Sequence, residues 1–220
     1  MYNVLLIIFI LSAYAIVHSY VVYPLWLIAF TSNKRSSRPQ FTLQDSLPEV
    51  AILMAAYNEE KVIGEKIASV LDTTYPLQKI TIYIGSDAST DKTDSIIEEF
   101  AKKHSQIKLV RFGGRTGKSG IVNQLASEAA QSVFILTDAN VIFKRDTIFN
   151  LIRHFKNDNT AQVAANIIKI SPSNKGIASQ EKSYIALENK IKNAESIRWN
   201  VIMGAEGGCY AIRRNNFSPV

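Results

Sequence analysis

The stretch EVAILMAAYNEE, residues 49–60, joins a continuous apolar run to a polar turn. A short apolar run that ends at polar residues is typical of a buried strand in a parallel sheet. Helical spacing follows, with Ile63, Ile67 and Val70 on one face. We therefore predict a strand, Glu49–Ala56, followed by a helix.

The same alternation continues along the chain. Four further apolar runs are interpreted as strands: Lys79–Gly85, Ile107–Phe112, Val133–Thr137 and Ala161–Ile170. Segments with helical spacing of apolar residues lie between them. Regular alternation with short connections predicts an α/β fold, with a mostly parallel, Rossmann-like sheet and helices on both faces. In such sheets ligands bind outside the carboxyl ends of the strands.

Polar segments follow the first four predicted strands. They are Tyr57–Glu60, Ser86–Asp91, Gly113–Gly120 and Asp138–Asn140. An aromatic ring, several acids and a basic glycine-rich loop would then meet at one edge of the sheet. Such a set suits a nucleotide diphosphate with its divalent cation, because Asp and Asn two residues apart on an extended segment can offer oxygens to one ion.

Two of these segments also have simpler interpretations. Ser89, Thr90 and Asp91 could cap the helix that follows them, because such side chains accept hydrogen bonds from its first free N–H groups. Asp138 could be an ordinary turn residue, which is the commoner role of Asp after a strand. Both interpretations stay open from the sequence.

The glycine-rich loop resembles the end of a P-loop at Gly117-Lys118-Ser119. A P-loop needs a first glycine that here falls on Phe112, so the spacing fails by one residue. No long apolar Walker-B run precedes Asp138. A P-loop NTPase is therefore the less favoured alternative.

The N-terminal residues 1–30 contain no charged side chain. A helix from Val4 to Phe30 would be about 40 Å long, against a hydrocarbon core of about 30 Å. A cleaved signal peptide is the competing interpretation, but the N-terminal region has no Lys or Arg and the apolar run is too long. We expect an uncleaved transmembrane anchor over residues 1–30.

A basic linker, residues 31–47, follows with Lys34, Arg35 and Arg38. By the positive-inside bias, this side of the anchor faces the cytoplasm. Residues 48–220 are then one domain in the cytoplasm, and the protein is a single-pass protein of the inner cell membrane in contact with membrane lipid.

The composition excludes several classes of protein. The chain of 220 residues is 47% hydrophobic, which is enough for a core and argues against disorder. A single cysteine excludes an intrachain disulfide framework and a Cys-based zinc cluster. The net charge of +6 is diffuse, so we expect no nucleic acid as partner.

Five segments, in this order, resemble the family-2 glycosyltransferases, in particular the membrane-anchored bacterial subgroup similar to cellulose, hyaluronan and poly-N-acetylglucosamine synthases. They are AAYNEE (55–60), SDASTDKT (86–93), GKSGIVNQL (117–125), TDAN (137–140) and GAEGGCYAIRR (204–214). The resemblance covers about residues 48–216.

The resemblance implies the A-type glycosyltransferase fold and a hexosyltransferase-like enzyme of polysaccharide biosynthesis. The implied reaction is an inverting transfer from a nucleotide-activated sugar, expected to be a UDP-sugar. The acceptor would be a saccharide or a lipid-linked molecule at the cytoplasmic membrane face. The implied cofactor is a divalent cation, Mg²⁺ or Mn²⁺.

The resemblance also implies roles for single residues. The nucleotide-binding residues would be Tyr57, Glu59, Asp87, Arg115 and Lys118. The metal ligands would be Asp138 and Asn140, where Asn is a variant of the family's second Asp. The acceptor side would include Glu206, Gly207 and Gly208.

Some family features do not match. The family's general base lies beyond the Tyr-Ala-Ile-Arg-Arg segment, so we expect it after Val220, with the C-terminal part of the domain missing; Glu206 is a weaker candidate. Glu195–Trp199 imitates a family motif but precedes the acceptor segment, and we interpret it as coincidence, with Trp199 packing against the core. A nucleotide-binding remnant without turnover therefore stays as an alternative to the enzyme.

Overall fold

The chain forms two compact units in the computed structural model, which describes residues 2–31, 38–168, 177–201 and 208–219. The smaller unit combines Met1–Ser37 with Ile168–Gly204, and the larger combines Arg38–Ile167 with Ala205–Val220.

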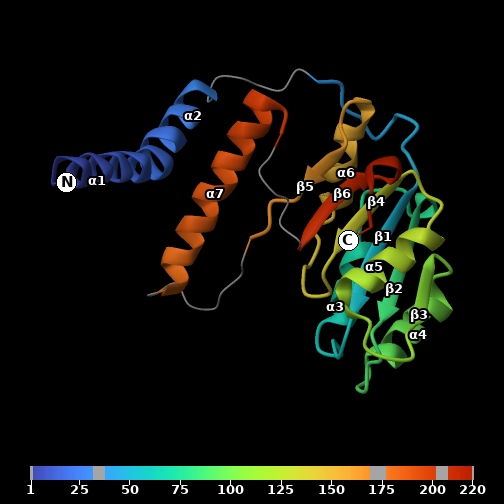
Figure 1. Cartoon of the computed structure of the whole chain (residues 1–220). Helices are drawn as coiled ribbons and strands as arrows, with labels where there is room; N and C mark the ends of the chain where they lie inside the picture. The colour runs from blue at the N-terminus through green and yellow to red at the C-terminus, as the bar shows by residue number, and fades with distance from the viewer. Residues whose placement is uncertain (1, 32–37, 169–176, 202–207, 220) are drawn as a thin grey trace. The chain divides into compact units, whose positions relative to one another are not determined.

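The larger unit is built on a six-stranded sheet in the order β3-β2-β1-β4-β6-β5 (Figure 1). The strands are β1 (Val50–Ala56), β2 (Ile80–Ser86), β3 (Ile107–Arg111), β4 (Val133–Thr137), β5 (Gln162–Ala164) and β6 (Cys209–Arg213). Strands β1 to β4 pair in parallel, whereas β6 is antiparallel to both of its neighbours. The predicted mostly parallel sheet is confirmed, and the first four predicted strands agree with the observed ones to within one residue at each end.

The end of the sheet at β5 and β6 differs from the prediction. Of the predicted strand Ala161–Ile170, the part that the structure describes, residues 161–168, contains only the three-residue strand β5, and β6 was not predicted as a strand. The length of a strand depends on its partner, and β6 pairs with β5 only at Tyr210, Ala211 and Ile212. The apolar pattern of one segment does not contain that information.

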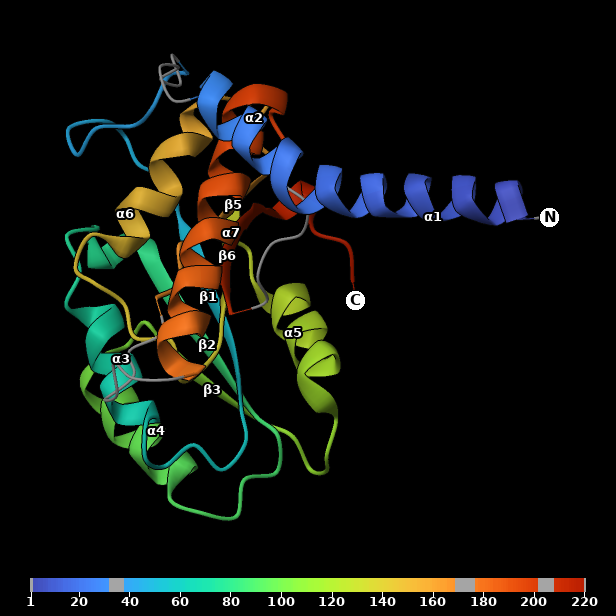
Figure 2. The same cartoon turned by 90° about the vertical axis from the view of Figure 1, so that its left-hand side faces the viewer.

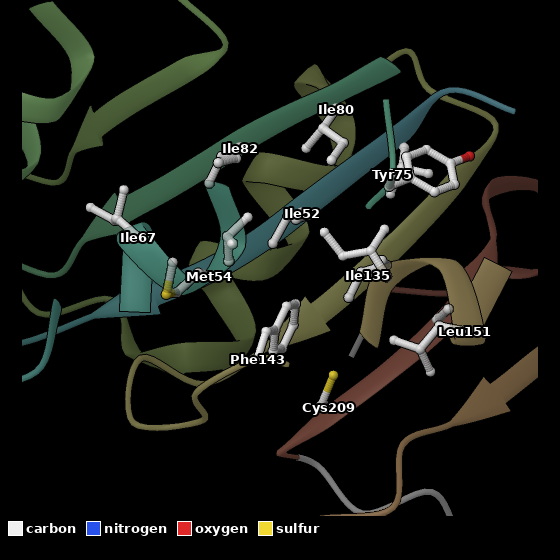
Figure 3. Packing of buried hydrophobic residues seen from close by; sticks show 14 of the residues in the cluster. Ile52, Met54, Ile67, Tyr75, Ile80, Ile82, Ile135, Phe143, Leu151 and Cys209 are labelled. Carbon is white, nitrogen blue, oxygen red and sulfur yellow. The ribbon is translucent and has the colours of Figure 1, made fainter. Parts of the chain in front are cut away.

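Helices cover both faces of the sheet, as predicted (Figure 2). The helices α3 (Ile63–Leu71), α4 (Thr93–Lys103) and α6 (Thr147–Ile152) contribute to one buried cluster together with β1 and β2, part of which Figure 3 shows. The helix α5 (Gly117–Glu128) contributes to a second cluster on the opposite face. Side chains alternate between the two faces along β1, with Ile52 and Met54 in one cluster and Ala51 and Leu53 in the other.

The smaller unit contains the N-terminal helices α1 (Tyr2–Val17), η1 (His18–Val22) and α2 (Tyr23–Thr31) and the long helix α7 (Ile177–Trp199). The first three follow one another without a break, and Tyr2–Thr31 is long and apolar enough to cross a membrane. The π-helical turn η1 precedes Pro24, whose missing N–H removes one α-helical hydrogen bond.

Helix α7 packs against α2 within this unit, and the Tyr23 hydroxyl donates a hydrogen bond to Glu195 Oε1 at 2.9 Å. Trp199, at the end of α7, is 48% exposed, and the Arg198 guanidinium lies 5.3 Å from its ring centroid. The expectation that Trp199 packs against the core of the sheet stays a prediction. This helix belongs to the N-terminal unit and not to the sheet.

Candidate functional site

The carboxyl ends of the parallel strands bring the predicted polar segments to one edge of the sheet. Ala56 lies beside Ser86, and Ser86 lies beside Arg111, so the loops after β1, β2 and β3 leave the sheet at the same level. Backbone hydrogen bonds continue this alignment, from Asp87 N to Ala56 O (2.9 Å) and from Phe112 N to Ser86 O (3.0 Å).

The loops that follow β1 and β2 are joined by side-chain hydrogen bonds. Asn58, in the left-handed region with φ of 53°, accepts a hydrogen bond from Thr90 N at 2.9 Å. Glu60 accepts one from Lys92 N, and Glu60 N donates to Asp91 Oδ2, both at 3.1 Å. These contacts fix the two loops against each other.

Asp91 contributes to both the helix and the loop contacts. Its Oδ1 accepts a hydrogen bond from Thr93 N at 2.9 Å, at the first residue of α4, while Oδ2 contacts Glu60 N. The helix-start role predicted for this segment is thus observed at Asp91, whereas Ser89 contacts Asn58 N (3.2 Å) instead.

Asp87 is the buried acid of the site, with 3% of its surface exposed. Its carboxylate accepts hydrogen bonds from Thr116 N (2.6 Å), Gly117 N (3.2 Å) and Arg115 Nε (3.1 Å). Gly117 has a φ of 82°, which a side chain would disfavour. The hydrogen bond from Thr116 N, with those of Gly117 N and Arg115, holds the pKa of Asp87 below its ordinary value against the effect of burial.

Arg115 also contacts the exposed aromatic ring of Tyr57. The guanidinium carbon lies 3.4 Å from the ring centroid, a cation–π contact. Tyr57, Asp87 and Arg115, which come from three loops, therefore form one contiguous group of side chains.

Lys118 and Asp138 form a second contact at this edge. Lys118 Nζ lies 2.5 Å from Asp138 Oδ1, and both side chains are partly exposed. Asn140, two residues after Asp138, is exposed. The structure thus places Lys118, in the first turn of α5, next to the acid after β4.

Glu59 lies close to further negative charge. Burial raises the pKa of Glu59, and the charges of Asp138 and Asp91 raise it further. Carboxylates close enough to raise the pKa of Glu59 in this way form a region of negative potential. A cation bound there would reduce this negative potential.

Asp138 and Asn140 fit a divalent ion only in part. Within the described residues, no group of three or more His, Cys, Asp and Glu side chains is arranged to hold a metal. Mg²⁺ commonly takes one or two carboxylates from the protein and its other oxygens from water and phosphates. The donor set here matches that pattern, with a diphosphate as the source of the missing oxygens.

The predicted acceptor residues are described only at Gly208, because Glu206 and Gly207 lie outside the described residues. The Gly208 carbonyl accepts a hydrogen bond from Asp138 N at 3.1 Å. The start of β6 therefore lies directly beside the acid after β4.

Sequence analysis missed two buried residues below this edge, Lys66 and Cys209. Both are 0% exposed. Lys66 Nζ donates hydrogen bonds to Thr137 Oγ1 at 3.0 Å and to the Val141 carbonyl. The signal was present in the sequence, since Lys66 falls on the apolar face of α3 that contains Ile63, Ile67 and Val70.

Comparison with known proteins identifies relatives of this chain. The family model described as glycosyl transferase family 2 matches residues 51–218. A beta-monoglucosyldiacylglycerol synthase from a Nostoc species is 32% identical over 126 residues, which cover 56% of this chain and 27% of that protein. A poly-beta-1,6-N-acetyl-D-glucosamine synthase from Staphylococcus epidermidis is 33% identical over 107 residues, 49% of this chain and 25% of that protein. The matched segment therefore spans about a quarter of the length of these relatives.

A solved structure has the same fold. The mannosyltransferase PcManGT from Pyrobaculum calidifontis, in complex with GDP-Man and Mn²⁺, superposes with a TM-score of 0.73 at 23% sequence identity, covering 92% of this chain and 55% of that one. The A-type glycosyltransferase fold expected from the sequence is confirmed by this likeness.

Proposed function

Because the chain belongs to glycosyl transferase family 2, we propose that it transfers a sugar from a UDP-sugar to a saccharide or lipid acceptor, with inversion at the anomeric carbon. The observation that carries this proposal is the meeting of two groups at one sheet edge. Tyr57, Asp87 and Arg115 form the first, and Lys118 and Asp138 form the second. Family membership also disfavours the P-loop NTPase.

The first group is proposed to bind the nucleoside. The Asp87 carboxylate and the Tyr57 ring offer a hydrogen-bond acceptor and a stacking surface, which a base and a ribose require. The Arg115 guanidinium lies on that ring. A base stacking on the same face would displace the guanidinium, which is then available to the diphosphate.

The second group is proposed to bind the diphosphate. Lys118 would contact it directly, and Asp138 and Asn140 would hold a divalent cation beside it. Mn²⁺ in the Pyrobaculum mannosyltransferase supports this assignment. When bound, the cation would stabilise the negative charge that develops on the leaving nucleoside diphosphate. The Asp138 charge raises the pKa of Glu59, so a cation bound at Asp138 would also act on Glu59.

The acceptor is proposed to approach along the segment that leads into β6, because Gly208 contacts Asp138 directly. Inversion requires the acceptor hydroxyl to attack the face opposite the diphosphate, with a base to take its proton. Glu206 is the candidate for this base within the acceptor segment. Names of relatives include both lipid and polysaccharide products, so either acceptor class fits.

The membrane is proposed as the place of action. Tyr2–Thr31 would be the anchor and residues 31–47 the basic linker, with the catalytic domain on the cytoplasmic side. This arrangement suits a lipid or a lipid-linked acceptor, because its head group lies at the same surface.

Calorimetry of UDP with the full chain tests the proposal. In Mn²⁺, Asp138→Asn should weaken UDP binding by about tenfold or more, equivalent to about 1.4 kcal/mol. In EDTA the same variant should bind UDP as well as or better than the wild type, because a negative charge near the diphosphate has gone. Asp146→Asn, the same change at the start of α6, should leave both affinities unchanged.

The opposite results would contradict the proposal in distinct ways. Equal affinities for wild type and Asp138→Asn in Mn²⁺ would remove Asp138 from the site. Preference for ATP over UDP would favour an NTPase. Binding of UDP without transfer from any radiolabelled UDP-sugar would favour the remnant without turnover.

A further inference from the structure

A fully buried lysine, Lys66, lies below the turn that follows β4. Lysine is almost never fully buried without a partner of opposite charge, and no acid among the described residues lies within ion-pair distance of Lys66. Burial lowers the pKa of Lys66 to about 7. The ammonium group is therefore costly to place here, and an apolar side chain of similar length would fill the same space at lower cost.

The head group of Lys66 bridges the two ends of this turn. It donates to Thr137 Oγ1 at 3.0 Å, at the last residue of β4, and to the carbonyl of Val141. Both Asp138 and Asn140 lie between these two contacts in the sequence. One side chain from α3 thus connects the two ends of the segment that contains both proposed metal ligands.

The remaining neighbours leave the head group little freedom. Nζ lies 3.5 Å from the centroid of the Phe143 ring, whose side chain points into the same cluster as Cys209 in Figure 3. Cys209 and Asp138 are the titratable groups that act on Lys66 electrostatically, and burial raises the pKa of the Cys209 thiol to about 11. The thiol is therefore uncharged at neutral pH, and Asp138 is the nearby charge that favours the ammonium form.

We propose that Lys66 is a positioning residue that holds the turn 137–141 in the shape in which Asp138 and Asn140 hold the cation beside the diphosphate. The proposal rests on the function proposed above. Its physical basis is that outer contacts which orient metal ligands typically change metal affinity by about 10- to 100-fold when removed. Lys66 would act through the turn and would not touch the donor.

Three variants of the full chain separate this role from simple packing. Lys66→Met keeps the length and apolar stem but removes the head group. Thr137→Val removes one of its acceptors at nearly constant volume. Ser69→Ala is the matched control, because Ser69 Oγ also tethers α3 to this region, but at Phe143 N (3.1 Å), outside the turn.

Two measurements are needed, of UDP affinity in Mn²⁺ by calorimetry and of amide hydrogen exchange in residues 137–143. Lys66→Met should lower UDP affinity about tenfold and speed exchange in 137–143, while leaving exchange in β2 unchanged. Thr137→Val should change both in the same direction by a smaller factor. Ser69→Ala should leave UDP affinity at the wild-type value.

A folded Lys66→Met variant with wild-type UDP affinity would overturn the proposal, even if exchange changes. If Lys66→Met does not fold, unchanged affinity and exchange in Thr137→Val would overturn it instead. If the wild type itself binds no UDP, the proposed function fails; the exchange data then still decide whether Lys66 holds the turn.

Discussion

Replacing Asp87 by Asn should loosen the glycine-rich loop without disturbing the rest of the sheet. Asp87 receives three hydrogen bonds, from Thr116 N, Gly117 N and Arg115 Nε. An asparagine that keeps its oxygen on Thr116 N presents an NH₂ group to the other two donors. The hydrogen bonds from Gly117 N and Arg115 Nε to the carboxylate are then lost. These two N–H donors face the NH₂ group of the asparagine, which is itself a donor.

The size of the effect follows from these contacts. A hydrogen bond to a charged group contributes about 1.5–3 kcal/mol, so two of them contribute about 3–6 kcal/mol. Arg115 is more than half exposed and recovers part of this from water. We expect the free energy of loop opening to fall by about 2–4 kcal/mol, which is about 30-fold to several hundred-fold in the opening equilibrium.

Hydrogen exchange of a peptide covering residues 112–120 measures this equilibrium directly. The control is Asp94→Asn, which removes a similar contact to Arg111 Nε at 2.9 Å but on the surface. Exposed pairs contribute about 0.2–1 kcal/mol, so exchange in 112–120 should be nearly unchanged in the control. Wild-type exchange rates in Asp87→Asn would refute the assigned hydrogen bonds.

The stabilisation by the Asp87 carboxylate depends on pH. Because the pKa of Asp87 is lower in the folded protein than its ordinary value of 3.8, the folded state binds fewer protons than the unfolded state near that pH. The stabilisation is therefore complete above about pH 5 and is lost as pH falls through the folded-state pKa. The difference between wild type and Asp87→Asn should shrink as the pH is lowered below 4.

Two further predictions concern the core and the membrane segment. Gly85→Ala should destabilise the fold by about 1–3 kcal/mol in urea unfolding, because its Cβ would lie 2.3 Å from Ile121 Cγ2. Gly114→Ala is the control and should be neutral, because no atom lies within 4 Å of its Cβ. Equal urea midpoints for the two variants would mean that α5 moves away at little cost. The full chain should stay in the membrane pellet after alkaline carbonate extraction, and its catalytic domain should be digested by protease in inside-out vesicles; release into the supernatant would contradict the anchor.

The repeated pattern of the β1–β4 region made its fold predictable. Val50–Ala56 and Val133–Thr137 are buried on both faces apart from the partly buried Ala55, and such runs are recognisable because every position except Thr137 is apolar. Their polar successors, Tyr57 and Asp138, are then fixed at the carboxyl edge by the parallel register. The positions of the proposed site residues follow from that register.

Contacts between distant segments were not predictable in the same way. Strand β6 enters the sheet between β4 and β5, although it follows them in the sequence by more than 40 residues. Lys66 was counted in no motif, because only the fold shows that its head group reaches Thr137, 71 positions away. The pairing of Arg115 with Tyr57 and Asp87 likewise depends on how three loops converge.

The two basic residues of the glycine-rich loop each contact an acid from another strand end. Arg115 contacts Asp87 after β2, and Lys118 contacts Asp138 after β4. A diphosphate that approaches them must compete with these carboxylates, so its affinity is the difference between two sets of ion contacts. A divalent cation changes that balance at Asp138, because it can take over the carboxylate and leave the lysine to the phosphate. No such exchange is available at Asp87, whose other hydrogen bonds come from the backbone. We therefore infer that dependence on a divalent cation arises at the Lys118–Asp138 contact, whereas the hydrogen bonds from Thr116 N and Gly117 N to Asp87 keep the loop in place throughout.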